Sequence, residues 1–368
     1  MTFFRKFLPK ILVSILVIAF LIISPFSLFG KIDSLNYNIN KEYKFDFSGV
    51  LTLWNVDTFE GGTKSRAGFL ENRALEFEKQ NKGVYINIQN LSPQELELNL
   101  NSGKKPNMIT FGIGVGEKIF DYLINFSSSF GVRDDLIQSA KQNNELKAIP
   151  IMLGGYTLIS NKELISGENI LESLKSSKNP NLVFSSKDYN NPLLALFVND
   201  LMLEKQEVLN LDSFDAYDKF INQKFCALLG TQRDFYRCKN RENNNKMQCE
   251  YNLLGGFSDL IVYASIFSSF EKAESVCKNF VEYLTCEYSQ QKLEQIGMFS
   301  VLNNIKSTDE DYKLFGETLQ KKLKTVNVFY SNQTLNEIKT LVTDYVVNNK
   351  LENKKEILKY INGWKYGN

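Results

Sequence analysis

The fold is decided between residues 51 and 89, which read LTLWNVDTFEGGTKSRAGFLENRALEFEKQNKGVYINIQ. Residues 50–56 are rich in β-branched and aromatic side chains and predict a strand, and residues 84–88 predict a second one. Between them, apolar residues recur at helical spacing from Ala67 to Phe77, and Lys82-Gly83 end the pattern. Strand, helix and strand form a βαβ unit, which predicts a parallel sheet with a right-handed crossover.

The same alternation continues along the chain. Residues 148–160 predict an extended apolar crossing that is interrupted by Gly154-Gly155. Further strands are expected at 108–111, 182–184 and 227–230. Helices are expected at 93–102, 134–140, 192–203, 213–223, 272–284 and 290–296 and through 309–363. The 368 residues exceed the size at which a single core stops growing, so two domains are expected.

The composition excludes several classes of function. Lys and Arg number 43 against 42 Asp and Glu, and this balance argues against a nucleic-acid binder. Histidine is absent, which removes imidazole-based catalysis and the commonest zinc and iron sites. No cofactor and no metal are therefore expected.

The N-terminus indicates export. Arg5, Lys6 and Lys10 precede an uncharged, mainly apolar run over residues 11–29. This pattern is typical of a signal peptide or a membrane anchor over residues 1–30, whose basic flank stays in the cytoplasm. Residues 31–48 are polar and are expected to form a spacer. The remainder is expected on the extracellular face of the cytoplasmic membrane, either secreted or anchored there.

Five cysteines lie between residues 226 and 286 without any C-x-x-C spacing, so no metal framework is implied. No cysteine precedes Cys226, which rules out a lipid-modified N-terminal cysteine. Cys238 and Cys249 bracket a polar segment that a disulfide could close, and buried, inert thiols are the alternative.

Four stretches together resemble a known family. They are residues 51–89 quoted above, SGKKPNMITFG at 102–112, AIPIMLGGYTLISNKELI at 148–165, and the stretch 256–302, which contains GFSDLIVYASIF and KNFVEYLTCEYSQQKLEQIGMFSVL. In order and spacing they are similar to the extracellular solute-binding proteins of bacterial ABC importers, especially the sugar-binding, family 1-like branch. In this resemblance 256–302 corresponds to the family's return helices.

The resemblance implies a two-lobe α/β fold of the periplasmic-binding-protein type. Each lobe would be a mainly parallel sheet flanked by helices, with a cleft between the lobes that closes over the ligand. Lobe 1 would comprise residues 49–153 and 257–303, and lobe 2 residues 154–256 and 304–368. Permease subunits of an ABC transporter would be the protein partners, and the solute would be delivered unchanged.

The loop after the first predicted strand supplies most of the expected ligand contacts. Its glycines let the backbone approach a ligand, its helix N-terminus favours an anion or hydroxyl group, and Arg66 could bind a carboxylate or phosphate. The alternative is that Ser65 or Thr63 only caps the helix and that Arg66 is solvated. The expected contacts in this loop are Asp57, Glu60, Gly61, Gly62, Thr63, Ser65 and Arg66.

Four further residues complete the predicted site. Gly112 follows a strand and begins a Gly-x-Gly-x-Gly run, which fits a cleft loop better than a nucleotide site. Tyr156 lies beside Gly154-Gly155, where its ring could stack on a sugar. Arg233 follows a strand of the second lobe and would point across the cleft, unless it pairs with Asp234. Asp259 is expected either at the ligand or in hinge hydrogen bonds.

The sequence therefore predicts a non-catalytic protein that captures a polar solute, with carbohydrate as the first choice. An anionic solute such as a sugar phosphate or carboxylate is an alternative within binding. A glycoside-processing enzyme that uses two carboxylates is an alternative from another class. A ligand-sensing ectodomain is the third.

Overall fold

The computed structural model describes residues 47–59, 62–165, 170–175, 181–203, 205–244, 246–303, 307 and 309–361. All of them belong to one compact unit, Phe45–Asn368. The predicted signal or anchor segment and the spacer up to residue 46 lie outside the described residues. Among the helices that are described, none has the length and hydropathy needed to cross a bilayer.

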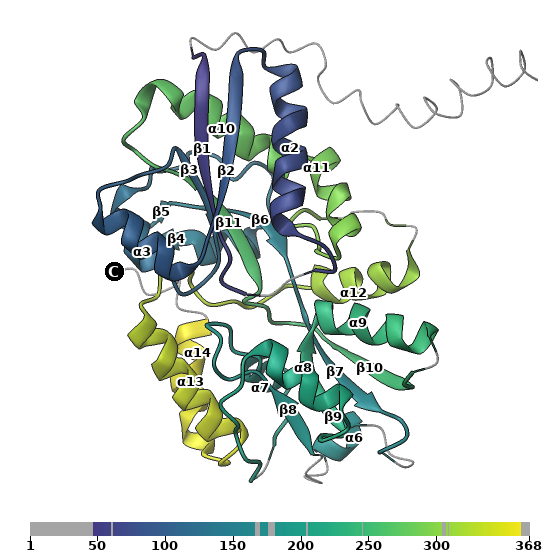
Figure 1. Cartoon of the computed structure of the whole chain (residues 1–368). Helices are drawn as coiled ribbons and strands as arrows, with labels where there is room; N and C mark the ends of the chain where they lie inside the picture. The colour runs from purple at the N-terminus through teal and green to yellow at the C-terminus, as the bar shows by residue number, and fades with distance from the viewer. Residues whose placement is uncertain are drawn as a thin grey trace, which may run out of the picture. The chain divides into compact units, whose positions relative to one another are not determined.

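A five-stranded sheet, in the order β2-β1-β3-β11-β6, organises the first half of the fold (Figure 1). β1 pairs in parallel with both β2 and β3, as the βαβ pattern predicts, whereas β11 runs antiparallel between β3 and β6. We call the part built on this sheet lobe 1. Its strands are β1 (Gly49–Val56), β2 (Val84–Leu91), β3 (Met108–Phe111), β6 (Ile149–Leu153) and β11 (Ile261–Ile266).

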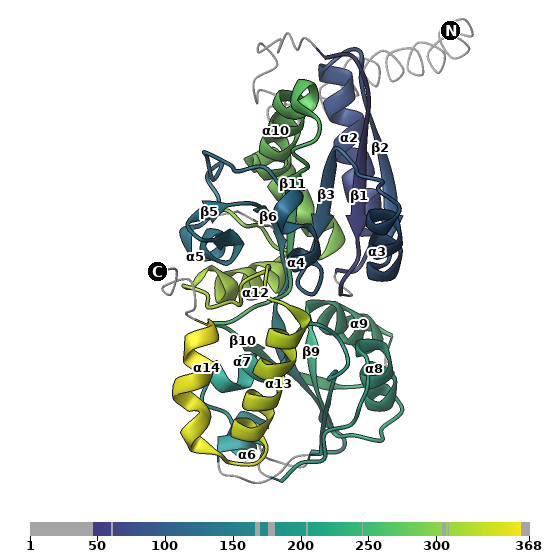
Figure 2. The ribbon, with the colours of Figure 1, turned by 90° about the vertical axis from the view of Figure 1, so that its left-hand side faces the viewer.

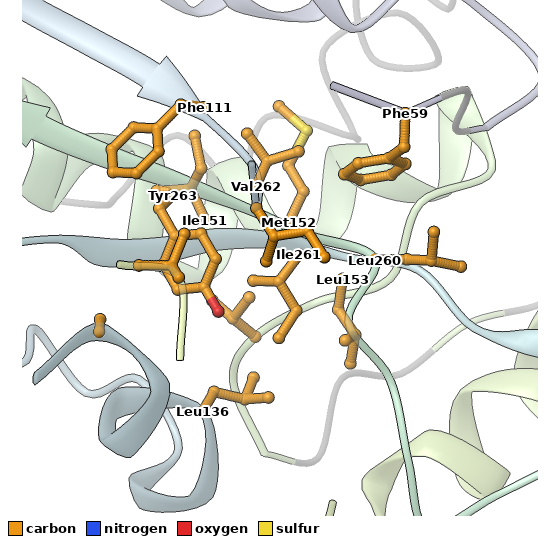
Figure 3. Packing of buried hydrophobic residues seen from close by; sticks show 14 of the residues in the cluster. Phe59, Phe111, Leu136, Ile151, Met152, Leu153, Leu260, Ile261, Val262 and Tyr263 are labelled. Carbon is orange, nitrogen blue, oxygen red and sulfur yellow. The ribbon is translucent and has the colours of Figure 1, made fainter. Parts of the chain in front are cut away.

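Two long helices of lobe 1 pack against each other beside this sheet. Phe77 of α2 (Arg66–Gln80) and Phe280 of α10 (Glu271–Thr285) meet edge to face, with ring centroids 5.2 Å apart. The remaining elements are short: α3 (Pro93–Asn101), α4 (Gly116–Ile119), α5 (Asp134–Ile137), α11 (Glu287–Gln291) and the hairpin of β4 (Lys141–Gln142) with β5 (Glu145–Leu146). The core of this lobe lies around β6 and β11, whose residues are all buried and whose apolar side chains pack on both faces of the sheet (Figure 3).

A four-stranded sheet, in the order β10-β7-β9-β8, organises the second half, which we call lobe 2. Only β8 and β9 pair in parallel, while β7 is antiparallel to both β9 and β10. The expectation of a mainly parallel sheet in each lobe is therefore wrong for lobe 2, and in lobe 1 two of the four strand pairs are parallel. The strands are β7 (Tyr156–Asn161), β8 (Leu182–Phe184), β9 (Ala227–Thr231) and β10 (Cys249–Leu254).

Helices surround this second sheet. α8 and α9 pack on one of its faces, where Ile159, Phe220 and Leu228 belong to a separate buried cluster. α13 contacts α7 and α14 (Figure 2). The helices of this half are α6 (Ile170–Lys175), α7 (Leu193–Val198), α8 (Ser213–Ile221), α9 (Gln232–Asn243), α12 (Glu310–Gln320), α13 (Asn332–Val346) and α14 (Lys354–Ile361).

Three expectations about secondary structure are corrected. Residues 261–266, expected within the return helices, form the fully buried strand β11, because a strand covered on both faces shows no alternation in its sequence. The polar α9 is absent from the predicted elements. α7 ends at Val198 instead of reaching residue 203. Cys238 and Cys249, the pair considered for a disulfide, are free thiols, and both are buried.

Two of the segments that connect the lobes lie next to each other: residues 154–155 between β6 and β7, and residues 255–260 between β10 and β11. We call them the crossings. The Gly154 N–H donates to the carbonyl of Leu260 at 2.6 Å, and the Ser258 hydroxyl donates to the carbonyl of Gly154 at 2.8 Å. The crossings therefore form one hydrogen-bonded hinge. The exact lobe boundaries given in the sequence analysis remain a prediction.

Candidate functional site

A pocket of about 660 Å³ opens between the β1–α2 loop of lobe 1 and the first turns of α8 and α9 in lobe 2. It lies beyond the carboxyl ends of β1, β8 and β9, where ligands of α/β sheets bind. We call it the interlobe pocket. Its lining consists of Asp57, Thr58, Phe59, Gly62, Thr63, Lys64, Ser65, Arg66, Asp188, Asp212, Ser213, Phe214 and Arg233.

The β1–α2 loop is held to the scaffold by the polar groups that were predicted to bind ligand. Ser65 is the N-cap of α2, and its hydroxyl accepts from the Gly68 N–H at 3.1 Å. The Thr63 N–H donates to the carbonyl of Ile296 at 2.7 Å. A Cβ at Gly62, whose φ is +71°, would lie 2.1 Å from that same carbonyl oxygen, so glycine is required there.

Arg66 is part of this framework and does not project freely into the pocket. Its side chain is only 8 % exposed, and the guanidinium pairs with Asp57 at 2.8 Å. The guanidinium also donates to the Phe59 carbonyl and stacks on the Phe59 ring, 4.4 Å from the centroid. Because its charge is already paired, the guanidinium is poorly placed to act as a fork for an incoming carboxylate or phosphate.

The lobe 2 wall is built at the start of α8. The Ser213 N–H and hydroxyl donate to Oδ2 of Asp188 at 3.1 and 2.7 Å, and Asp212 caps the helix by accepting from the Asp215 N–H. Lys339 of α13 donates to the backbone carbonyls of Ser186 and Asp188, and burial lowers the pKa of its ammonium group. Phe214, which follows Ser213 in α8, is 60 % exposed.

α9 forms the remaining wall. Thr231 and Asp234 form a capping box at its start, which places Arg233 on the first turn. Arg233 lines the interlobe pocket and also a second depression of about 470 Å³, which shares Gly62 and Thr63 with it and continues past Tyr236 and Asn240. The cleft thus extends along one side of α9.

The charged groups of the interlobe pocket balance. Three carboxylates, from Asp57, Asp188 and Asp212, face three cations, from Lys64, Arg66 and Arg233. The pocket lining is therefore polar and carries no net charge, which suits a ligand that has hydroxyl groups and no net charge.

Tyr156 and Asp259 lie away from this lining. The Tyr156 hydroxyl donates to Oδ1 of Asp259 at 2.5 Å, and the Asn191 N–H donates to Oδ2 at 2.8 Å. Both side chains are almost completely buried, at 2 % and 1 % exposed. Burial raises the pKa of Asp259, and burial together with the carboxylate raises that of Tyr156. In this structure the Tyr156 ring is buried outside the pocket lining and Asp259 makes its hydrogen bonds within the hinge, so ligand contact by either residue stays a prediction.

Gly112 also has a packing role. A Cβ at this position would lie 2.2 Å from Oγ1 of Thr58 and 3.3 Å from the Phe59 ring. The glycine thus lets the β1–α2 loop approach the end of β3. Further along the same run, a Cβ at Gly114 would lie 2.3 Å from the Tyr189 ring. The Gly-x-Gly-x-Gly run therefore permits close packing beside the pocket.

The structure brings six of the eleven predicted site residues to the interlobe pocket. The predicted residues Asp57, Gly62, Thr63, Ser65, Arg66 and Arg233 line the interlobe pocket. Glu60 and Gly61 fall outside the described residues, and Gly112, Tyr156 and Asp259 are not among the lining residues. Asp188, Asp212, Ser213 and Phe214 also line the pocket and are absent from the predicted site, and only Asp188, in the loop that follows the predicted strand 182–184, had a signal in the sequence. In the part of the chain that the structure describes, no group of three His, Cys, Asp or Glu side chains could hold a metal ion.

No protein-family model and no curated protein matches the sequence. Solved structures do match over most of the chain. The GacH receptor of Streptomyces glaucescens GLA.O, solved unliganded and with acarbose, is 12 % identical, covers 88 % of this chain and 99 % of its own, and has a TM-score of 0.57.

Two further structures are similar. The maltose-maltodextrin binding protein of Alicyclobacillus acidocaldarius is 12 % identical, with 85 % of this chain and 100 % of its own covered and a TM-score of 0.55. The sugar-binding protein MalE from Xanthomonas citri is 13 % identical, with 86 % and 97 % covered and a TM-score of 0.57. The chain therefore has the two-lobed α/β fold of these sugar-binding proteins.

Proposed function

We propose that the protein is an extracellular solute-binding protein that captures an uncharged polar solute, a carbohydrate, in the interlobe pocket and delivers it to an ABC importer. The observation that carries the proposal is the lining of this pocket, which combines positively and negatively charged side chains with the exposed ring of Phe214. The fold shared with sugar-binding proteins supports the same solute class.

The chemistry of the lining favours hydroxyl groups. Carboxylates accept hydrogen bonds from hydroxyls, and lysine and arginine side chains donate to them. Phe214 adds a flat apolar surface of the kind that packs against the C–H face of a sugar ring. A pocket volume of about 660 Å³ lies within the ordinary range for small-molecule sites.

Two of the three alternatives derived from the sequence receive less support. An anionic solute depended on Arg66, which is paired with Asp57 and bonded to the Phe59 carbonyl. A two-carboxylate glycosidase requires an acid of raised pKa at the substrate. Asp259 has a raised pKa, but it is buried in the hinge and does not line the pocket.

The proposal also includes export of the protein from the cytoplasm and its docking to permease subunits. The basic, then apolar N-terminal segment supports a location outside the cytoplasm, either secreted or tethered to the membrane. Hinged lobes that close on a solute would offer permease subunits a surface that differs between the loaded and the empty state. The lobes contribute no chemistry to the solute in this scheme.

A thermal-shift panel of the full chain with neutral sugars, sugar phosphates, amino acids and organic acids tests the proposal. A neutral sugar at 100 times its Kd should stabilise the folded protein by about 2.7 kcal/mol. A shift produced only by anionic compounds would contradict the assignment of an uncharged solute. Appearance of a chemically altered product would contradict the assignment of a binding protein.

A further inference from the structure

One side chain joins α9 to both the hinge and lobe 1. Gln232, the first residue of α9, is fully buried. Its side-chain Oε1 accepts from the Gly155 N–H at 2.9 Å, and the backbone N–H of Gln232 donates to the Gly155 carbonyl at 2.9 Å. Its Nε2 donates to Sδ of Met298, in lobe 1, at 3.2 Å. A single amide therefore contacts a helix of lobe 2, a crossing and lobe 1.

The backbone around Gln232 is shaped to admit this amide. A Cβ at Gly154 would lie 2.8 Å from both terminal atoms of the Gln232 side chain, so only glycine leaves room for it. Gly154 is also the residue that bonds to the second crossing through Leu260 and Ser258. The amide thus packs where the two crossings meet.

The same turn of α9 forms the wall of the interlobe pocket. Arg233 follows Gln232 and lines both the pocket and the depression that extends it. One turn further on, a Cβ at Gly297 of lobe 1 would lie 3.0 Å from the Tyr236 ring. Any motion of α9 relative to lobe 1 therefore changes the width of the pocket.

We propose that Gln232 is a positioning residue that keeps α9 fixed to the crossing while the lobes open and close. The inference rests on the proposed function, because it treats the pocket as a ligand site. The two bonds to Gly155 involve strong amide partners, whereas a thioether is a weak acceptor. On opening, the bond to Met298 breaks at little cost and the bonds to Gly155 remain, so Arg233 moves together with the hinge.

Gln290 provides a matched control. It is also a fully buried glutamine, and its Nε2 donates to the carbonyls of Ile151 and Leu284 at 2.9 and 2.8 Å. Its Oε1 accepts from the Ser300 hydroxyl and the Val301 N–H. None of these four partners belongs to α9 or to residues 154–155. Gln290→Met should therefore cost stability without changing the position of α9.

The test uses the ligand-free full chain, so its result is independent of whether the solute has been identified. Hydrogen exchange and small-angle scattering are measured for the wild type, Gln232→Met and Gln290→Met. In Gln232→Met, loss of the amide acceptor should speed exchange in peptides covering 154–157 and 232–237 on the order of tenfold and increase the radius of gyration. In Gln290→Met, faster exchange should be confined to peptides within residues 149–153 and 284–301.

Exchange within about twofold of wild type at 154–157 in Gln232→Met would overturn the proposal. Equal acceleration at 232–237 in Gln290→Met would also overturn it. Should Gln232→Met fail to fold, Met298→Leu removes only the sulfur acceptor and keeps the volume. It should leave exchange at 154–157 within about twofold of wild type, because the bonds to Gly155 are kept, and clearly faster exchange there would again contradict the proposal. None of these outcomes bears on whether the pocket binds a sugar, which the thermal-shift panel decides separately.

Discussion

The lining of the interlobe pocket and the hinge beneath it use similar residue types in opposite ways. In the pocket, Asp188 and Phe214 are placed where a solute could reach them. In the hinge, Asp259 and Tyr156 bond to each other and are almost completely buried. An acid and an aromatic residue can therefore serve as binding surface or as framework, and the difference between the two lies in burial and partners.

Arg66 lies between these two cases. It lines the pocket, yet its bonds to Asp57 and to the Phe59 carbonyl hold the shape of the loop. Substitutions can therefore be ordered by how deeply each side chain is buried and hydrogen-bonded within the protein. We call such residues framework residues, and their substitution should lower the free energy of unfolding. Substitution of exposed lining residues should instead weaken ligand binding.

Asp259→Ala should give the largest effect. Removal of the carboxylate leaves the Tyr156 hydroxyl and the Asn191 N–H buried without an acceptor, which should lower the free energy of unfolding by about 3 kcal/mol. Denaturant unfolding measures the change. A loss below about 1 kcal/mol would place Asp259 outside the framework.

Arg66→Ala should be intermediate. The substitution removes a buried guanidinium that bonds to Phe59 and stacks on its ring, and we expect a loss of about 2 kcal/mol in unfolding free energy. The Asp57 side of the ion pair is half exposed and should add little. Lys64→Ala in the same loop is the control and should change unfolding by less than about 0.5 kcal/mol.

Phe214→Ala should weaken binding and spare the fold. Because the ring is mostly exposed, unfolding should change by less than about 0.5 kcal/mol. Loss of a stacking surface should raise the Kd for the bound sugar about tenfold, which corresponds to about 1.4 kcal/mol. Calorimetric titration measures the Kd. An unchanged Kd would remove Phe214 from the binding surface.

The pH dependence of stability should give the smallest signal. Burial raises the pKa of Asp259 from its ordinary value of 3.8, so the folded state holds its proton to higher pH than the unfolded state does. The free energy of unfolding should therefore fall as pH rises from about 4 to the raised pKa. Asp259→Asn keeps an acceptor for Tyr156 and removes the titration, so its stability should lack this decline. A parallel decline in both proteins would assign it to other groups.

The sequence predicted the parts of the fold in which local pattern and tertiary packing agree. The βαβ unit of lobe 1 was recognisable because α2 has a buried face at helical spacing and because β1 and β2 are rich in β-branched residues. β11 was mistaken for helix because all six of its residues are buried. α9 was missed because its residues are mostly polar, although Thr231 and Asp234 form a capping box that marks its start.

The candidate site was predictable only in part, for related reasons. The loop after β1 could be placed because a strand and a helix frame it. The contribution of α8 depends on the packing of lobe 2, which sequence spacing does not encode. Tyr156 follows two glycines in the first crossing and Asp259 lies in the second, positions that suggest a cleft, and only the structure shows that the two side chains bond to each other. Sequence position indicates proximity to a cleft, whereas burial decides whether a side chain reaches it.

The central claim is that the interlobe pocket binds an uncharged carbohydrate, and calorimetric titration of the ligand-free full chain at low and high salt tests it most directly. The account predicts that a neutral sugar binds with a Kd that does not depend on salt and that its phosphate ester binds more weakly. Tighter binding of the phosphate ester, with a Kd that rises steeply with salt, would contradict the claim.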